Sequence, residues 1–433
     1  MNDQNKPNPT MEPAKATRRG AIKSAAVGIA ALSMAQRMVH AQGNEVLRVG
    51  LVGCGGRGTG AAQNTMNADK YAHVVALADA YEDRLQSCRE SLSRRYAEQS
   101  PIKDEHCYVG VDAYQKLIAE ADVDIVLLCT PPHFRPAHLE AAINAGKHIF
   151  CEKPIATDPT GVRKVLELTR IAESKKLNLV SGLCWRYDLG VKATINRIKD
   201  GMIGNIVATQ ENYLTGTLWQ RNRRDGWTDM DYQLRNWLYY KWLSGDHIVE
   251  QFIHSLDKSL WLHNDEPPKL AYGLGGRQVR VGEEFGDVYD HFSVVYEWAD
   301  GTRTFAHTRQ MADCFNQTED FIYGTKGTAK VLANVVDAYD SSWKYDGPKP
   351  NMYDEEHREM YKAIRSGTAI NNGKYMCYST LMAIMGREAC YSGTAIQWDK
   401  LLNSPMDLSP LNYLRETAPP KVEIAIPGKY KLV

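Results

Sequence analysis

The chain has 433 residues, of which 43% are hydrophobic, enough to build the cores of two ordinary domains. Its 52 basic residues balance 52 acidic ones, so its overall charge indicates no nucleic-acid or acidic-polymer partner. The nine cysteines show no C-x-x-C or zinc-like spacing, and we expect small buried thiols instead of a disulfide framework.

The first 41 residues have the pattern of an export signal. Thr17-Arg18-Arg19 precedes a short run of small apolar residues, and Val39-His40-Ala41 offers a cleavage site after Ala41. The paired arginines favour the twin-arginine route of bacteria. We therefore expect export to the periplasm, with the twin-arginine machinery as a partner. The alternative is a basic tail with no targeting role.

An apolar strand then leads into Gly53-Cys54-Gly55-Gly56-Arg57-Gly58, a G-x-G-x-x-G motif typical of dinucleotide sites. Gly53 would permit a tight turn, Gly55 a close approach to a diphosphate, and Gly58 close packing of helix on strand. The helix that follows would direct its N–H groups at the phosphates. The alternative is a glycine-rich turn that binds nothing.

Asp79 ends the next predicted strand, at residues 74–78. A carboxylate there can bind the ribose hydroxyls and would repel a 2′-phosphate, so we expect NAD as the cofactor, with NADP disfavoured.

Strands and helices alternate from residue 46 to 181, which predicts an α/β domain with a doubly wound parallel sheet, the NAD-binding Rossmann domain. Asp158-Pro159 would begin a helix that runs to about Lys176. The other expected elements are strands at 123–129, 148–151 and 177–181 and a helix at 136–145.

Residues 182–402 change character and predict an α+β domain for substrate binding and oligomerisation, with an open, largely antiparallel sheet. Asp300-Gly301 would join two antiparallel strands, and helices would cover one face near the domain junction. The predicted strands are 291–298, 302–309, 318–323 and 328–332, and the helices 355–365 and 379–391. Residues 403–433 would form an extended surface tail.

Chemistry-bearing residues follow two strands of the parallel sheet. Thr130-Pro131-Pro132-His133 and Glu152-Lys153-Pro154 would lie where ligands bind in such folds, at the carboxyl ends of strands. The Lys153 ammonium could reach a nicotinamide and a bound hydroxyl and stabilise a developing alkoxide. The alternative is a solvated lysine. The predicted cofactor-binding residues are Gly53, Gly55, Gly56, Arg57, Gly58, Asp79, Thr130, Pro131, His133, Glu152 and Lys153.

A third group is Glu250, His254 and Asp257, which would share one face of a helix. An imidazole accepts protons near neutral pH, and a carboxylate one turn away can orient it. The carboxylate–histidine pair could also hold a metal, but no third ligand is evident, so no metal site is predicted. The remaining alternative is a structural histidine.

Aromatic residues cluster between Tyr213 and Trp242, interleaved with arginines. Trp219 and Trp237 are candidates for a wall that packs on the C–H faces of a sugar, while a subunit interface is the alternative interpretation. The substrate-binding candidates are Arg186, Tyr187, Trp219, Trp237 and Asp257.

Four segments together, G-C-G-G-R-G, T-P-P-H, A-G-K-H-I-F-C-E-K-P and the acid-x-x-x-His-x-x-Asp segment after Gly245, resemble the Gfo/Idh/MocA family of oxidoreductases. The resemblance implies a Rossmann domain, then a sheet domain that carries the substrate and builds a homo-oligomer. It implies that Lys153 and His254 are the catalytic lysine and histidine. Glu250 stands where many members have aspartate.

We therefore expect an exported NAD-dependent oxidoreductase that acts on a sugar or polyol hydroxyl. Because the periplasm supplies little free cofactor, NAD would be loaded before export, stay tightly bound and be recycled internally. One alternative is an NAD-dependent, redox-neutral glycosidase, although the exported glycosidases of this kind depart from E-K-P. The other is a non-catalytic sugar-binding protein.

Overall fold

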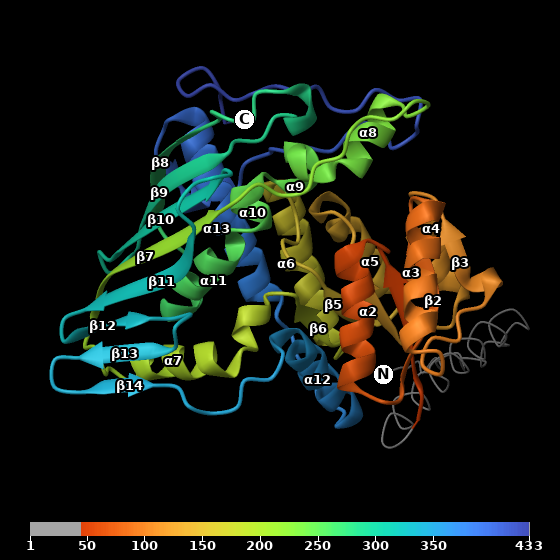
Figure 1. The fold of residues 1–433 in the computed structure, drawn as a ribbon, viewed down its shortest axis with the longest axis horizontal. Coiled ribbons are helices and arrows are strands. Elements are labelled where there is room, and N and C mark those ends of the chain that lie inside the picture. The colour runs from red at the N-terminus through yellow and green to blue at the C-terminus, as the bar shows by residue number, and fades with distance from the viewer. Residues whose placement is uncertain (1–44, 433) are drawn as a thin grey trace, which may run out of the picture.

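The computed structural model describes residues 45–432, which form two sheets with helices between and around them (Figure 1). The predicted export signal, residues 1–41, lies outside the described residues. No helix in the described part of the chain is long and apolar enough to cross a membrane.

The amino-terminal sheet is six-stranded and parallel, in the order β3-β2-β1-β4-β5-β6. Its strand order reverses between β1 and β4, which confirms the predicted doubly wound sheet. Both faces of β1 and β4 are buried, and this explains their nearly continuous apolar sequences. The strands are β1 (Leu47–Val52), β2 (Ala72–Asp79), β3 (Cys107–Val109), β4 (Ile125–Leu128), β5 (His148–Cys151) and β6 (Leu179–Ser181).

Five helices cover this sheet: α2 (Gly56–Ala68), α3 (Glu82–Arg95), α4 (Ala113–Glu120), α5 (Arg135–Asn144) and α6 (Pro159–Ser174). The predicted start of α6 is confirmed, because Asp158 caps it by accepting a hydrogen bond from the Gly161 amide at 2.7 Å. Pro159 occupies the first helical position, where its missing N–H costs nothing.

The second sheet has nine strands in the order β14-β13-β12-β11-β7-β10-β9-β8-β15. Every neighbouring pair is antiparallel except β7 and β10, so the expected open, largely antiparallel sheet is confirmed. The strands are β7 (Ile206–Thr215), β8 (Leu270–Gly276), β9 (His291–Glu297), β10 (Arg303–Gln310), β11 (Gln317–Gly324), β12 (Gly327–Lys330), β13 (Val335–Ala338), β14 (Ser342–Lys344) and β15 (Ile396–Gln397).

Helices lie between the two sheets (Figure 1). The long α13 is buried along nearly its whole length and packs on β8 and β9 on one side and on α6 of the first domain on the other. The helices of this half are α7 (Leu189–Lys199), α8 (Asp229–Arg235), α9 (Lys241–Ser244), α10 (His247–Glu250), α11 (Ile253–Leu262), α12 (Met352–Arg365), α13 (Gly373–Ser392) and α14 (Trp398–Leu402).

Helix α12 returns to the amino-terminal domain and packs against α2. The Thr65 hydroxyl and His357 Nδ1 are 2.9 Å apart, and Arg365 pairs with Asp69 at 2.6 Å. The chain after α14 contains no helix or strand up to residue 432. The nine cysteines all lie in the described range and are free thiols. Six are buried as expected, whereas Cys107 and Cys129 are partly buried and Cys314 is exposed.

The turn between β1 and α2 predicts a sharp contrast between two glycine substitutions. A Cβ at Gly58 would lie 1.8 Å from the Gly53 carbonyl oxygen, whereas one at Gly60 meets only the Arg57 guanidinium, at 3.8 Å. We expect Gly58→Ala to lower the free energy of unfolding by more than about 2 kcal/mol and Gly60→Ala to be neutral or slightly stabilising. Chemical denaturation would measure both, and equal stability of the two variants would contradict the close packing.

Candidate active site

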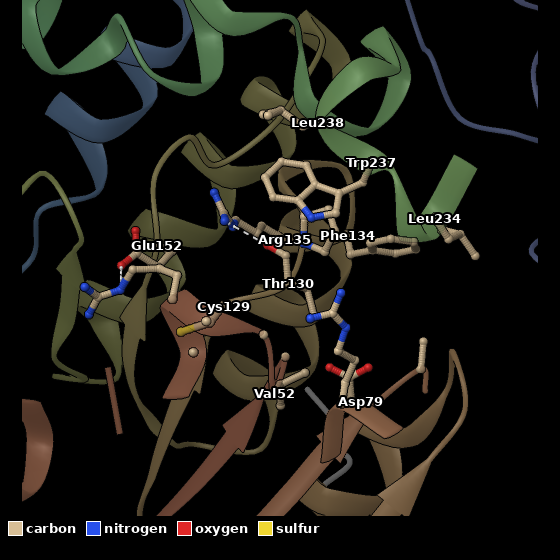
Figure 2. Close-up of a pocket in the computed structure, with 18 of the residues that line it drawn as sticks. Val52, Asp79, Cys129, Thr130, Phe134, Arg135, Glu152, Leu234, Trp237 and Leu238 are labelled. Atoms are coloured by element: carbon tan, nitrogen blue, oxygen red, sulfur yellow. Dashed lines mark hydrogen bonds and ion pairs between the residues drawn. The ribbon is translucent and has the colours of Figure 1, made fainter. Parts of the chain in front are cut away.

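A cavity of about 650 Å³ opens at the carboxyl ends of the parallel strands. In Figure 2, Val52, Cys129 and Asp79 lie on one side, at the strand ends, and Trp237 and Leu238 face them from the second domain. The cavity is therefore built by both domains, at the place where the strand order reverses and ligands bind in such folds.

The glycine turn forms the floor of this cavity, and the structure gives a separate reason why each of these positions is a glycine. Gly53 has φ +98°, and a Cβ there would lie 2.7 Å from the backbone of Cys129. Gly55 and Gly56 face open space, with no atom within 4 Å of a Cβ. The floor is thus bare backbone at the start of α2, and this fits a diphosphate approaching the amide groups.

Asp79 lies at the end of β2 and lines the same cavity. Its carboxylate accepts hydrogen bonds from the amides of Cys54, at 2.7 Å, and Tyr81, at 2.9 Å. Burial raises its pKa, an effect that these two amide bonds oppose. The fixed carboxylate beside the glycine turn fits the predicted ribose contact of NAD.

Lys153 extends from the end of β5 to the second domain. Its ammonium donates to the backbone carbonyl of Glu250 and lies 3.1 Å from Glu250 Oε1. The side chains of both residues are more than four-fifths buried. Two acceptors from one residue thus fix the ammonium at the wall of the cavity.

His254 lines the cavity beside Lys153. Burial, followed by the ammonium groups of Lys153 and Lys258, holds its pKa well below the ordinary value. The imidazole is therefore neutral at pH 7 and can accept a proton. Its Nδ1 has no hydrogen-bond partner among the described residues.

Glu152 and Arg57 form an ion pair of 2.9 Å that is drawn at the left of Figure 2. The Arg57 guanidinium also donates to Asn64 and lies 4.7 Å from the centre of the Tyr353 ring. Both residues line the cavity, where Arg57 is fixed between α2 and α12.

Most of the predicted residues meet at this cavity. Its lining includes Gly53, Gly55, Gly56, Arg57, Gly58, Asp79, Thr130, Pro131, Glu152, Lys153, Trp219, Trp237, Glu250 and His254. Trp219 and Trp237 both line the cavity with their ring centres 5.9 Å apart, and their contact with a sugar stays a prediction.

Four predicted residues lie elsewhere, and their predicted ligand contacts are not supported. Arg186 is buried and bonds to Asp257 at 2.8–3.1 Å and to Asp265 at 2.6 Å, so both Arg186 and Asp257 are engaged in ion pairs and neither lines the cavity. Tyr187 donates to Asn372 at 2.8 Å. His133 sits in a tight turn that directs it away from the cavity, toward Trp242, and its Nε2 is 2.8 Å from the Tyr413 hydroxyl.

The prediction that Glu250, His254 and Asp257 share a single helix is also wrong. Glu250 ends α10, and α11 begins at Ile253, so a turn separates the acid from the histidine. This break lets Glu250 bond to Lys153 and not to His254. The described residues contain no group of three or more metal-ligating side chains.

Several lining residues were missed by the sequence analysis. Phe134, Arg135 and His138 follow T-P-P-H directly, and their position at the start of the next helix could have indicated them. Tyr213 comes from β7, a strand that was not predicted, and it begins the aromatic cluster noted in the sequence although it was not among the candidate site residues.

An open glycine turn and a lysine–histidine pair in one interdomain cavity define a two-domain, dinucleotide-dependent oxidoreductase. Family comparison agrees. Residues 47–182 match the oxidoreductase family with an NAD-binding Rossmann fold, and residues 191–330 match the Gfo/Idh/MocA C-terminal domain. The chain belongs to the Gfo/Idh/MocA family, and NAD is its cofactor.

Individual relatives are distant. The chain is 29% identical to an inositol 2-dehydrogenase of Rhizobium meliloti over 285 residues, 65% of this chain and 74% of that protein. It is 24% identical to a glycosyl hydrolase family 109 protein of Shewanella amazonensis, over 78% of this chain and 70% of the other. The crystal structure of aldose-aldose oxidoreductase from Caulobacter crescentus superposes with a TM-score of 0.64 at 18% identity, covering 82% of this chain and all of the other.

The charges around His254 predict a measurable coupling to Lys153. Lys153→Met removes a positive charge beside the imidazole, so we expect the pKa of His254 to rise toward its ordinary value. Histidine ring resonances followed by NMR in the cofactor-free protein would measure it. Lys164→Met is the control, because Lys164 pairs with Glu140 on the surface of the first domain. An unchanged His254 titration in Lys153→Met would contradict the arrangement.

Proposed function

We propose that the protein is an exported NAD-dependent oxidoreductase that acts on a CH–OH group of a sugar or polyol and keeps its cofactor bound. The observation that carries the proposal is the meeting of Lys153 and His254, from two domains, in the cavity that holds the glycine turn. The name of the inositol 2-dehydrogenase relative supports a polyol or sugar as substrate.

The two residues divide the work on the hydroxyl. His254, neutral because of its lowered pKa, accepts the hydroxyl proton. The Lys153 ammonium stabilises the negative charge that develops on the oxygen, and its bonds to Glu250 hold it in place. Bound NAD supplies the acceptor for the hydride that leaves the same carbon.

The wall opposite the strand ends supports a carbohydrate ligand. Trp219, Trp237 and Tyr213 line the cavity together with Gln251. Aromatic rings pack on the C–H faces of a sugar ring, and the amide and the nearby charged groups can bind its hydroxyls.

A redox-neutral glycosidase is the second candidate, favoured by the glycosyl hydrolase relative that aligns with 78% of this chain. Such an enzyme would oxidise a sugar hydroxyl, eliminate the aglycone, add water and reduce the product. Lys153 and His254 suit its first step equally well, so only the products separate the two candidates. The presence of both residues argues against a non-catalytic sugar-binding protein.

The decisive experiment assays NAD-loaded protein against a panel of polyols, free sugars and aryl glycosides. Net NADH formation, or hydride exchange between two sugars, supports the oxidoreductase, and aryl release without net NADH supports the glycosidase. We expect Lys153→Ala and His254→Ala each to lower kcat/KM at least about 100-fold, while Lys164→Ala leaves it unchanged. Full activity in both site variants, or no reaction with any substrate by wild type, would overturn the proposal.

Export rests on the arginine pair and apolar run at the amino terminus. When the full chain is expressed, we expect cell fractionation to find the protein in the periplasm, and we expect Arg18→Lys combined with Arg19→Lys to keep it in the cytoplasm. Lys15→Arg, a conservative change outside the pair, is the control. An unchanged distribution of the double variant would rule out the twin-arginine route.

A further inference from the structure

Residues 216–240, here called the arginine segment, leave the second sheet and extend over the first domain. Arg235 forms two bonds to the Asp83 carboxylate on α3, at 2.8 and 3.0 Å. Its guanidinium also lies 3.8 Å from the centre of the Tyr81 ring. The Tyr81 hydroxyl in turn lies 3.3 Å from Asp231 Oδ1. The segment is thus anchored at the edge of the cofactor cleft, and Figure 1 shows its helix α8 above the helices of the first domain.

The carboxyl-terminal tail holds the arginine segment from its other side. Arg415 pairs with Asp231 through bonds of 2.6 and 2.9 Å, and Gln233 lies within 3.5 Å of the Pro420 carbonyl oxygen. The Thr228 side chain and Asp231 form a complete capping box at the start of α8. These contacts give the segment a fixed position.

A second pocket, of about 510 Å³, lies between the arginine segment and the glycine turn. Its floor is formed by Gly55 and Gly56 and the first turns of α2, and its sides by α3. Four arginines line it, Arg84, Arg221, Arg224 and Arg235, whereas Asp83 is the only acid in the lining. Asp83 is paired with Arg235, so the other three guanidinium groups have no ion-pair partner in the lining. Arg84 and Arg221 also line the first cavity, whereas Arg224 lines the second pocket alone.

None of these three guanidinium groups has a carboxylate partner among residues 45–432. Arg221 Nε is buried and has no hydrogen-bond partner within the described chain. Burial first, and then the neighbouring guanidinium groups of Arg84, Arg235 and Arg224, lower the pKa of Arg221. Crowded positive charges with a buried unpaired donor are costly unless an anion joins them.

We propose that Arg221 and Arg224 bind the cofactor's diphosphate from the side opposite the glycine turn and so make NAD a resident group. The proposal rests on the proposed function, because it takes NAD as the ligand. In this arrangement the amides at the start of α2 and the two guanidinium groups enclose the diphosphate between the domains. Dissociation of NAD then requires the anchored arginine segment to move.

The 2′-phosphate of NADP is the other phosphate that arginines here could bind. The position of Asp79 disfavours it, because that carboxylate, fixed by two amides at the end of β2, would repel a 2′-phosphate. The diphosphate, common to both dinucleotides, is therefore the group we assign to Arg221 and Arg224.

The test measures retention of the cofactor and needs no turnover. Wild type and the variant Arg221→Ala with Arg224→Ala are loaded with NADH, and its dissociation is followed by the loss of bound-NADH fluorescence against excess NAD. We expect dissociation to be about 10- to 100-fold faster in the variant. Wild-type dissociation should also depend more steeply on salt concentration.

Arg223→Ala is the matched control, because this neighbour pairs with exposed Asp229 and does not line the pocket. It should release NADH at the wild-type rate. Equal thermal stability of the cofactor-free proteins checks the fold, and Arg221→Gln with Arg224→Gln replaces the alanine variant should that one fail to fold.

Repeating the measurement with NADPH separates the two phosphates. Similar acceleration for both cofactors supports the diphosphate assignment, whereas acceleration for NADPH alone overturns it, as does an unchanged rate for both. The result is independent of the catalytic assignment. Saturating NAD should restore turnover to the arginine variant but not to Lys153→Ala, and inactive wild type that still retains NAD would refute the proposed function alone.

Discussion

The contact between Lys153 and Glu250 joins the two domains at the site, and the proposed chemistry depends on it. Lys153 belongs to the end of β5, while Glu250 ends α10 and offers both its carbonyl and its carboxylate. Because the ammonium has two acceptors from the opposite domain, its position depends on how the domains are packed. The rigid packing of α13 against α6 and of α12 against α2 supplies that constraint.

Buried charges behind His254 support this arrangement. Lys258 donates to the His254 carbonyl at 2.8 Å and pairs with Asp320 at 3.0 Å, with both side chains almost fully buried. Nearby, burial and the carboxylate of Asp320 raise the pKa of Glu211 to about 8. Glu211 is thus largely protonated at pH 7, and the Lys258 charge is balanced mainly by Asp320. The same ammonium helps to lower the pKa of His254 and so to keep its imidazole neutral. A buried ion pair outside the cavity thus affects the protonation of a residue that lines it.

Much of the first domain was predictable because its signals are local. Apolar strands buried on both faces, the capping residue Asp158 and the glycine turn each follow from a few adjacent residues. The Gly58 contact with the Gly53 carbonyl shows how strict that turn is. Loops at the carboxyl ends of parallel strands must meet at one edge, so Thr130 and Lys153 could be placed together from the sequence alone.

The second domain was harder, since its decisive contacts join distant residues. The spacing of Glu250, His254 and Asp257 fits one helix, but the helix is interrupted at residues 251 and 252. The position of that interruption depends on how α10 and α11 each pack against α13. Asp257 bonds to Arg186, 71 positions away, which no local pattern reveals. The sequence of strand β7 mixes polar and apolar residues without a clear alternation. The strand forms because its backbone pairs with β10 and β11, so no local pattern predicted it.

The arginine segment extends the contact between the two domains to the proposed diphosphate site. A glycine turn alone binds a diphosphate from one side and leaves the other side to solvent, where ions compete for the charge. Here a segment of the second domain, held by Asp83 and Arg415, carries guanidinium groups beside the glycine turn. The segment that carries them also contributes Trp219 and Trp237 to the cavity wall. If the proposal holds, cofactor retention and substrate contact depend on the same stretch of chain, so a movement that released the cofactor would also displace the proposed substrate wall. An enzyme built this way is suited to a reaction that returns its cofactor to the starting state within one binding event.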